Sequence, residues 1–219
     1  MARQRKSVSP SKSKTTPPKN TLVKRKNAPS RFNFTTEQVI IGGTILFTIL
    51  VVGLVIFNSA RNQQIQNQEI EDVEVFANPG GGHTESPVSY PQTPPVGGQH
   101  HPVWQQCSVY TEPIIDEHAV HSLEHGAVWI TYQPDLPADQ VERLQALTRR
   151  STHRLLSPYP GQDSPIIVTA WVYQLRLESA DDNRLTAFIQ KYEQGPQTPE
   201  FGATCSGGET RTASQLGLG

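Results

Sequence analysis

The first 36 residues contain no acidic side chain, although the whole chain carries nearly equal numbers of positive and negative charges. Ten of the 19 Lys and Arg residues precede the first acidic residue, Glu37, and the other nine follow an apolar segment together with 19 acidic residues. The formal net charge of −1 therefore hides a basic half and an acidic half. Residues 1–36 also have too few apolar side chains to build a core, so we expect a disordered cytoplasmic tail.

Aromatic residues and folded motifs are missing from residues 1–31 as well. A segment that binds nucleic acid usually combines its basic charge with such features, so we expect no nucleic-acid partner. Each Lys or Arg near an anionic membrane surface contributes about 1 kcal/mol of attraction. The tail is therefore interpreted as a determinant of membrane topology that contacts lipid headgroups, with the lipid bilayer as its partner.

Charged residues are also absent from the 19-residue apolar run at positions 39–57. At about 1.5 Å per helical residue, this run matches the roughly 30 Å hydrocarbon core of a bilayer, and it has no polar face to expose to water. We predict a single transmembrane helix over residues 37–58. The basic residues before it place the N-terminus in the cytoplasm and export the C-terminal domain. Cleavage of a signal peptide near Ala60 is the alternative.

The exported half divides into three predicted parts. Residues 59–90 begin as a polar stalk and continue as a linker rich in Pro and Gly, which weaken helices and strands. Residues 91–206 form an extracytoplasmic domain of ordinary size. Residues 207–219 are expected to be a flexible tail.

Within the domain, the alternation of β-branched and amphipathic segments predicts an α+β fold. Strands are expected at 127–132 and 165–177, which are rich in β-branched and aromatic residues. A short strand is also expected at 153–156, where the Ser-Pro-Tyr-Pro-Gly segment ends it. Helices are expected over 134–150 and 181–192, where apolar residues recur at helical spacing. This order predicts a small mixed sheet with two helices packed on it.

Cysteine is scarce, with only Cys107 and Cys205 in the chain. Their wide separation excludes a CxxC redox motif. In an exported domain such a pair more often forms a disulfide than a metal site. A bridge closing so long a loop would stabilise the fold by up to about 5 kcal/mol in the chain-entropy model. We therefore predict a Cys107–Cys205 disulfide.

Histidine is concentrated in one stretch, with six of the seven between positions 83 and 125. A helix over 116–125, with Asp116 as N-cap and Gly126 as its left-handed end, would place several of them on one side. These are His118, His121 and His125. Imidazole is a common ligand of Zn and Cu, so we expect such an ion, if one binds, to be held by a small set of histidines. The candidate ligands are His121, His125 and the loop residue His100, with His118 as a further candidate. Histidines that only order the Pro-rich loop remain the alternative.

The segment from His121 to His125 also matches the H-x-x-E-H motif of a class of metallopeptidases. In that class both histidines bind Zn and the glutamate, here Glu124, activates water. The motif requires a distant acidic ligand, for which Glu193 and Glu200 are the late candidates. A metal-dependent hydrolase with Glu124 as its base is therefore an alternative function.

The segment His-Ser-Leu-Glu-His-Gly-Ala-Val-Trp-Ile-Thr-Tyr, residues 121–132, resembles a bacterial family known as domain of unknown function 3105. The likeness continues in residues 93–100, in Leu-Ser-Pro-Tyr-Pro-Gly at 156–161, and around Cys205. It covers roughly residues 90–208. The resemblance implies a membrane-anchored exported domain and implies no reaction.

Three functional hypotheses remain open at this point. The leading one is a membrane-tethered extracytoplasmic accessory domain, non-enzymatic, that binds Cu or Zn and works beside a membrane protein complex. The second is the metal-dependent hydrolase. The third is a purely structural subunit of a membrane complex. Metal analysis separates the third hypothesis from the other two.

Overall fold

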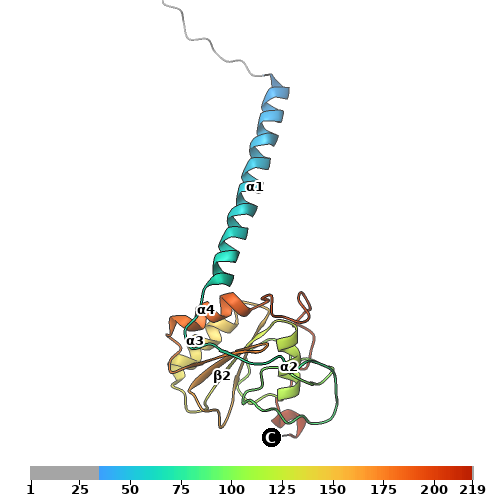
Figure 1. Cartoon of the computed structure of the whole chain (residues 1–219), viewed down its shortest axis with the longest axis vertical. Helices are drawn as coiled ribbons and strands as arrows, with labels where there is room; N and C mark the ends of the chain where they lie inside the picture. Colours follow the sequence, from blue (N-terminus) through green and yellow to red (C-terminus); the bar gives the residue numbers. More distant parts are fainter. Residues whose placement is uncertain (1–34, 219) are drawn as a thin grey trace, which may run out of the picture. The chain divides into compact units, whose positions relative to one another are not determined.

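A computed structural model describes residues 35–218, so the predicted basic tail lies almost entirely outside the described residues. The first element is the long helix α1 (Thr36–Asn67; Figure 1). Its large apolar side chains from Val39 to Phe57 are exposed. Two threonines inside its apolar run return their hydroxyl hydrogen bonds to the helix backbone: Thr44 donates to the Ile40 carbonyl and Thr48 to the Thr44 carbonyl. The helix is long and apolar enough to cross a membrane, and it continues into the predicted stalk.

The remaining elements form an α+β fold around a five-stranded mixed sheet, as the sequence predicted. The strand order is β1-β5-β4-β2-β3, and only the β2–β3 pair is parallel. The strands are β1 (Glu74–Val75), β2 (Val128–Tyr132), β3 (Arg154–Pro158), β4 (Ile166–Ala170) and β5 (Tyr173–Leu177). All five residues of β2 are buried, which fits its place inside the sheet and its apolar sequence.

The segment 165–177, expected as one strand, is a hairpin of β4 and β5. The chain reverses at Trp171 and Val172, and Val172 has a φ of 62°. A β-branched residue rarely adopts this conformation, so no turn signal is visible in the sequence. The turn is held instead by neighbours: the Val172 N–H donates to the Val96 carbonyl, and the Phe76 N–H donates to the Val172 carbonyl.

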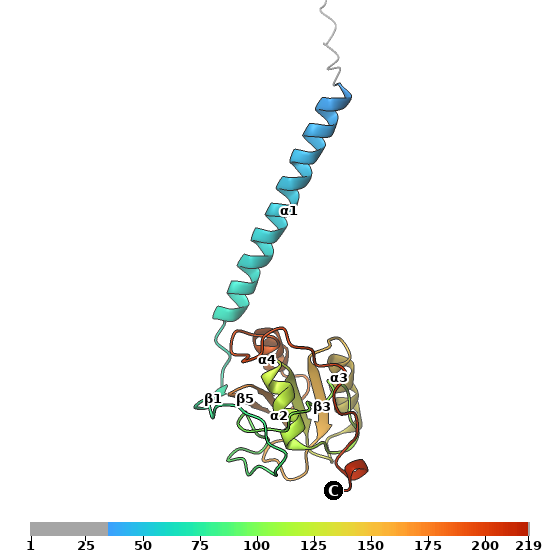
Figure 2. The same cartoon turned by 90° about the vertical axis from the view of Figure 1, so that its right-hand side faces the viewer.

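Helices cover both faces of the sheet (Figures 1 and 2). The helices α3 (Ala138–Thr148) and α4 (Asn183–Tyr192) pack on one face, as two helices were expected to do. A third helix, α2 (Asp116–Glu124), packs on the opposite face around Trp129. Because side chains alternate along β2, its neighbours Val128 and Ile130 belong to the first core and Trp129 to the second.

The start of α2 differs from the predicted capping pattern. Asp116 is the first residue of α2 and not its N-cap; the N-cap is Ile115, which makes no side-chain capping bond. The Asp116 carboxylate instead accepts a hydrogen bond of 2.8 Å from the Tyr159 hydroxyl. Gly126 ends the helix as predicted, with a φ of +89°.

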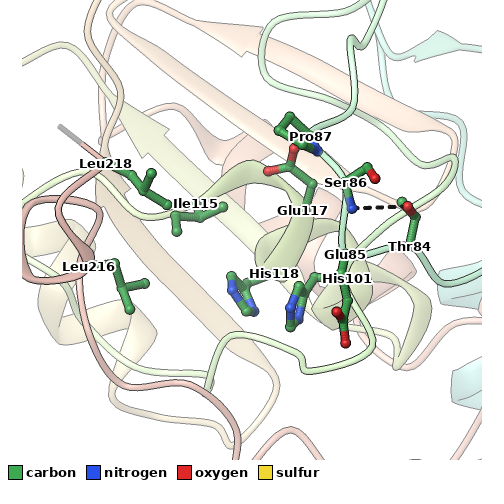
Figure 3. A pocket seen from close by; sticks show the side chains of 10 residues that line it. All are labelled: Thr84, Glu85, Ser86, Pro87, His101, Ile115, Glu117, His118, Leu216 and Leu218. Atoms are coloured by element: carbon green, nitrogen blue, oxygen red, sulfur yellow. Dashed lines mark hydrogen bonds between the residues drawn. The ribbon is translucent and has the colours of Figure 1, made fainter.

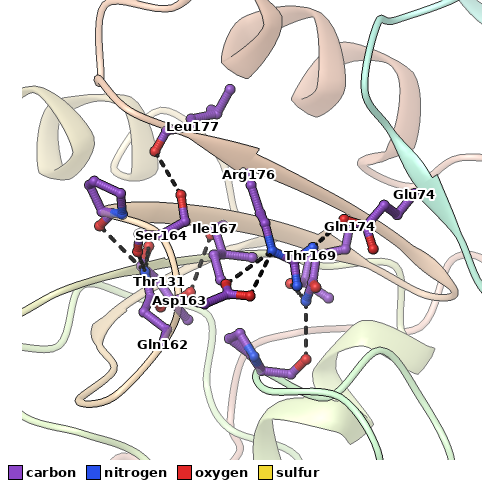
Figure 4. A network of polar contacts seen from close by, with 12 residues as sticks. Glu74, Thr131, Gln162, Asp163, Ser164, Ile167, Thr169, Gln174, Arg176 and Leu177 are labelled. Atoms are coloured by element: carbon purple, nitrogen blue, oxygen red, sulfur yellow. Dashed lines mark hydrogen bonds and ion pairs between the residues drawn. The ribbon is translucent and has the colours of Figure 1, made fainter.

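Residues on both sides of the predicted domain pack onto it. Ile70 and Val73, in the predicted linker, contact the first core, and β1 adds a short antiparallel strand beside β5. Figure 4 shows how this edge is held: Arg176 of β5 pairs with Asp163 at 3.0 Å and also with Glu74 of β1. The packed region therefore begins upstream of residue 91.

The Pro- and Gly-rich segment wraps the face that carries α2, and the C-terminal segment joins it there. In the linker, the Thr84 N–H donates to the His100 carbonyl at 2.8 Å. In the C-terminal segment, the Glu209 carbonyl accepts a hydrogen bond of 2.8 Å from the Gln106 N–H. Cys107 and Cys205 are joined as a disulfide with their Cα atoms 5.4 Å apart. Both the linker and the segment after residue 206 thus satisfy backbone groups on the domain.

Candidate metal centre

Two groups of potential metal ligands lie at the C-terminal end of α2. The four-residue group contains His83, His100, His121 and Glu124, and the three-residue group contains His121, His125 and Glu200. Within each group the ligand atoms lie within 4.8 Å of one another. His121 belongs to both.

The helix and the linker supply these side chains for simple geometric reasons. Glu124 and the C-cap residue His125 follow His121 of α2 by three and four residues, about one turn, so both side chains lie on the same side as that of His121. His83 and His100 face each other because the linker forms a parallel bridge between these two residues. The sequence-predicted residues His100 and His121 also lie together, with their ring centroids 4.8 Å apart.

Three histidines are fixed in the same tautomer by backbone carbonyls. A carbonyl oxygen can only accept a hydrogen bond, so a ring nitrogen bonded to it must carry the proton. These Nδ1–H bonds run from His100 to Gly98 at 2.8 Å, from His121 to His101 at 2.7 Å and from His125 to Thr204 at 2.7 Å. Each ring therefore keeps an unprotonated Nε2 in its neutral form, which is how metal-binding histidines are usually oriented.

The environment of His100 fits a metal ligand. Its side chain is completely buried, and its Nε2 lies 2.9 Å from Oε2 of Glu124. The direction of this contact does not make a hydrogen bond, and Nε2 has no hydrogen-bond partner among residues 35–218. A buried polar atom of this kind costs free energy unless something binds it.

Charge and burial keep the shared ligand neutral. Burial, aided by the neighbouring imidazoles, lowers the pKa of His121 to about 4, although the His101 carbonyl opposes this shift. The ring is therefore unprotonated at neutral pH, the form that binds metal. The Glu124 carboxylate supplies the negative charge that an ion in this group would need.

Gly81 allows the linker to approach the Glu124 carboxylate closely. A Cβ atom at Gly81 would lie 2.7 Å from Oε1 of Glu124 and 3.9 Å from Cε1 of His100. A larger residue there would displace the carboxylate from its position beside His100.

His118 lies in neither group. Its Nδ1–H donates to the Val103 carbonyl at 2.5 Å, and its ring packs 4.2 Å from that of His101. Figure 3 shows this pair at a cavity of about 250 Å³ between the linker, the start of α2 and the C-terminal residues. Of the four sequence-predicted ligands, the structure thus places three in the two groups.

Sequence reasoning did not place His83 in the site and assigned Glu124 only as a catalytic base. His83 has no periodic relation to the residues of α2, whereas Glu124 follows His121 by three residues and shares its side of the helix. The only signal for His83 was the Gly-Gly-Gly-His segment, which allows close backbone approach. Glu200, considered only as a distant acidic ligand, lies with its Oε2 3.3 Å from Nε2 of His125.

Comparison with protein families matches residues 83–207 to the family described as "Protein of unknown function (DUF3105)". The matched region spans more than half of the chain and contains every residue of both ligand groups and both cysteines. No curated protein and no solved structure matches the chain. The resemblance predicted from residues 121–132 is therefore confirmed, and the chain belongs to the DUF3105 family of proteins of unknown function.

Proposed function

We propose that this chain is a membrane-tethered metal-binding domain that holds one Zn(II) or Cu(II) ion outside the cytoplasm. The ligands of the resting ion are those of the four-residue group. The observation that carries the proposal is the buried Nε2 of His100, which lacks a hydrogen-bond partner in the described part of the chain while facing Glu124 and His121.

The donor set selects the class of metal. Three imidazoles and one carboxylate match the nitrogen and oxygen ligands that Zn(II) and Cu(II) accept, whereas Ca(II) and Mg(II) prefer oxygen alone. Both cysteines are paired in the disulfide, so no thiolate is offered to the ion. Carbonyl bonds to Nδ1 of His100 and His121 orient the rings and raise their basicity as ligands.

The tether follows from two features of the chain. The helix α1 has the length and apolarity to span a bilayer. The basic residues before it and the disulfide after it both favour an exported domain. The domain would then act beside a membrane protein complex, without requiring a reaction of its own.

Metal titration of the full chain in detergent tests the proposal. After treatment with a chelator and its removal, calorimetry should find one Zn(II) or Cu(II) per chain. His100→Ala should abolish tight binding at the four-residue group. Glu124→Gln should weaken it, because a neutral amide is a poorer ligand than a carboxylate.

The matched control is His118→Ala. His118 lies on the same helix, is buried, and makes the same kind of Nδ1 bond, but it belongs to neither group. Its loss should leave the metal stoichiometry unchanged. A wild-type chain that binds neither ion, or a control that loses binding as completely as His100→Ala, would refute the proposal.

A further inference from the structure

We propose that the three-residue group is an outer position for the same ion, through which it reaches and leaves the four-residue group. This inference rests on the proposed function, because it assumes that the four-residue group holds the resting ion. His121, which is common to both groups, is the residue that passes the ion from one position to the other.

The two positions cannot be filled at once through His121. Its Nδ1–H is bonded to the His101 carbonyl at 2.7 Å, which leaves Nε2 as its single free lone pair. One lone pair coordinates one ion. The groups are therefore alternative positions for one ion rather than a site for two.

The three-residue group is the one suited to exchange. The Glu200 side chain is 51% exposed, whereas that of Glu124 is 12% exposed and that of His100 is fully buried. Three protein ligands also leave one position of a tetrahedral ion open, where an incoming or departing donor can bind. A partly exposed carboxylate additionally attracts cations from solution.

Backbone contacts hold this outer position in place. The Glu200 N–H donates to the Glu124 carbonyl at 3.0 Å, which fixes the glutamate against the end of α2. His125 is fixed on its other side by the Thr204 carbonyl. The segment 200–204 thus carries its carboxylate to the helix without depending on a bound ion.

Stopped-flow mixing of the full chain with Cu(II) tests the inference. Trp104 provides the signal, because its ring lies 4.9 Å from that of His125 and Cu(II) quenches indole fluorescence. Glu200→Gln should lower both the association rate and the release rate to excess chelator by about tenfold. The equilibrium Kd should change by less than about threefold, because Glu200 acts on the path of the ion and not at its resting position.

Glu178→Gln is the control, since it removes one exposed negative charge outside both groups and should leave both rates unchanged. Unchanged rates in Glu200→Gln would overturn the inference and indicate passage beside the exposed His83. A raised Kd with an unchanged association rate would also overturn it, because Glu200 would then be a resting ligand. A wild-type chain that binds no Cu(II) and no Zn(II) would instead refute the proposed function.

Discussion

At the scale of single residues, we expect Asp116 at the start of α2 to make the stability of the domain depend on pH. Burial raises the pKa of the Asp116 carboxyl to about 6 from 3.8, although the hydrogen bond from Tyr159 opposes the shift. Because the folded-state pKa is the higher one, the contribution of Asp116 to stability is complete below about pH 3.8 and is lost as the pH rises through about 6. The full loss corresponds to about 3 kcal/mol.

Asp116→Asn should therefore stabilise the protein at pH 7 and have no effect near pH 4. The amide keeps an oxygen that can accept the Tyr159 hydrogen bond, but it cannot ionise. Denaturant unfolding of both proteins with chelator present, at intervals from pH 4 to pH 7, measures the difference. Buried His121 has a shifted pKa in both proteins, so its contribution to the pH dependence of stability cancels in the difference between them. A difference that is the same at every pH would contradict the prediction.

The residues of the candidate site were only partly predictable, and the reason is their separation along the chain. His121 and His125 could be paired from helical spacing alone. His83 and Glu200 join them through a linker bridge and through a backbone bond after Pro199, and neither contact has a sequence period. The tautomers of the rings likewise depend on carbonyls that only the folded chain brings near.

At the scale of elements, the chain can turn at the C-terminal end of α2 because residue 126 is a glycine. Gly126 has a φ of +89°, and a Cβ atom there would lie 2.5 Å from Nε2 of Gln194 and 3.0 Å from the Thr198 side chain. Gly126→Ala should therefore lower the free energy of unfolding by about 2–4 kcal/mol, from left-handed strain of about 1–2 kcal/mol and the displaced side chains. Thermal or denaturant unfolding measures this change.

Gly161→Ala is the matched control for Gly126→Ala, because it adds the same Cβ atom at a similar positive φ in open space. Gly161 has a φ of +82°, but a Cβ atom there would meet no heavy atom of the surrounding residues within 4 Å. Its substitution should cost the backbone strain alone, about 1–2 kcal/mol. Equal losses for the two variants would show that the contacts of Gly126 with Gln194 and Thr198 contribute nothing.

The disulfide joins two segments that have little regular structure of their own. Cys107 and Cys205 are 98 residues apart, and the Cys107 N–H also donates to the Cys205 carbonyl. Reduction should lower the free energy of unfolding by up to about 5 kcal/mol, since the unfolded chain regains the entropy of the open loop. The melting temperature with and without reductant measures the loss, and the Cys107→Ser, Cys205→Ser double variant should not respond to reductant. Two freely alkylated thiols in the native protein would contradict the bridge.

Helices and strands were predicted correctly where the spacing of apolar residues and the local composition determine them. The helices α3 and α4 and the strand β2 follow from apolar spacing and β-branched composition. The β4–β5 hairpin was missed because its turn places Val172 at positive φ, which only its bonds to Val96 and Phe76 explain. The path of the linker and of the C-terminal segment likewise has no periodic signal in the sequence, because Pro- and Gly-rich backbone follows neither a helix nor a strand pattern.

At the scale of the whole molecule, the separation of charge predicts how the chain is oriented in a membrane. Ten basic residues precede the apolar run at 39–57, and only Arg61 follows this run closely. Positive residues are retained in the cytoplasm, so the N-terminus should stay there and the domain should be exported. An exported domain would also meet the oxidising conditions that a disulfide requires.

Reporter fusions test this orientation directly. A reporter that is active only outside the cytoplasm should be active when fused after Gly219 and inactive when fused at the N-terminus. Replacing the ten basic residues before Glu37 with Gln should reduce or reverse the difference, because the orientation depends on their charge. As the control, Arg211→Gln, far from the helix, should change nothing. Cytoplasmic activity of the C-terminal fusion in the wild-type chain would contradict the orientation and, with it, a metal site that exchanges its ion outside the membrane.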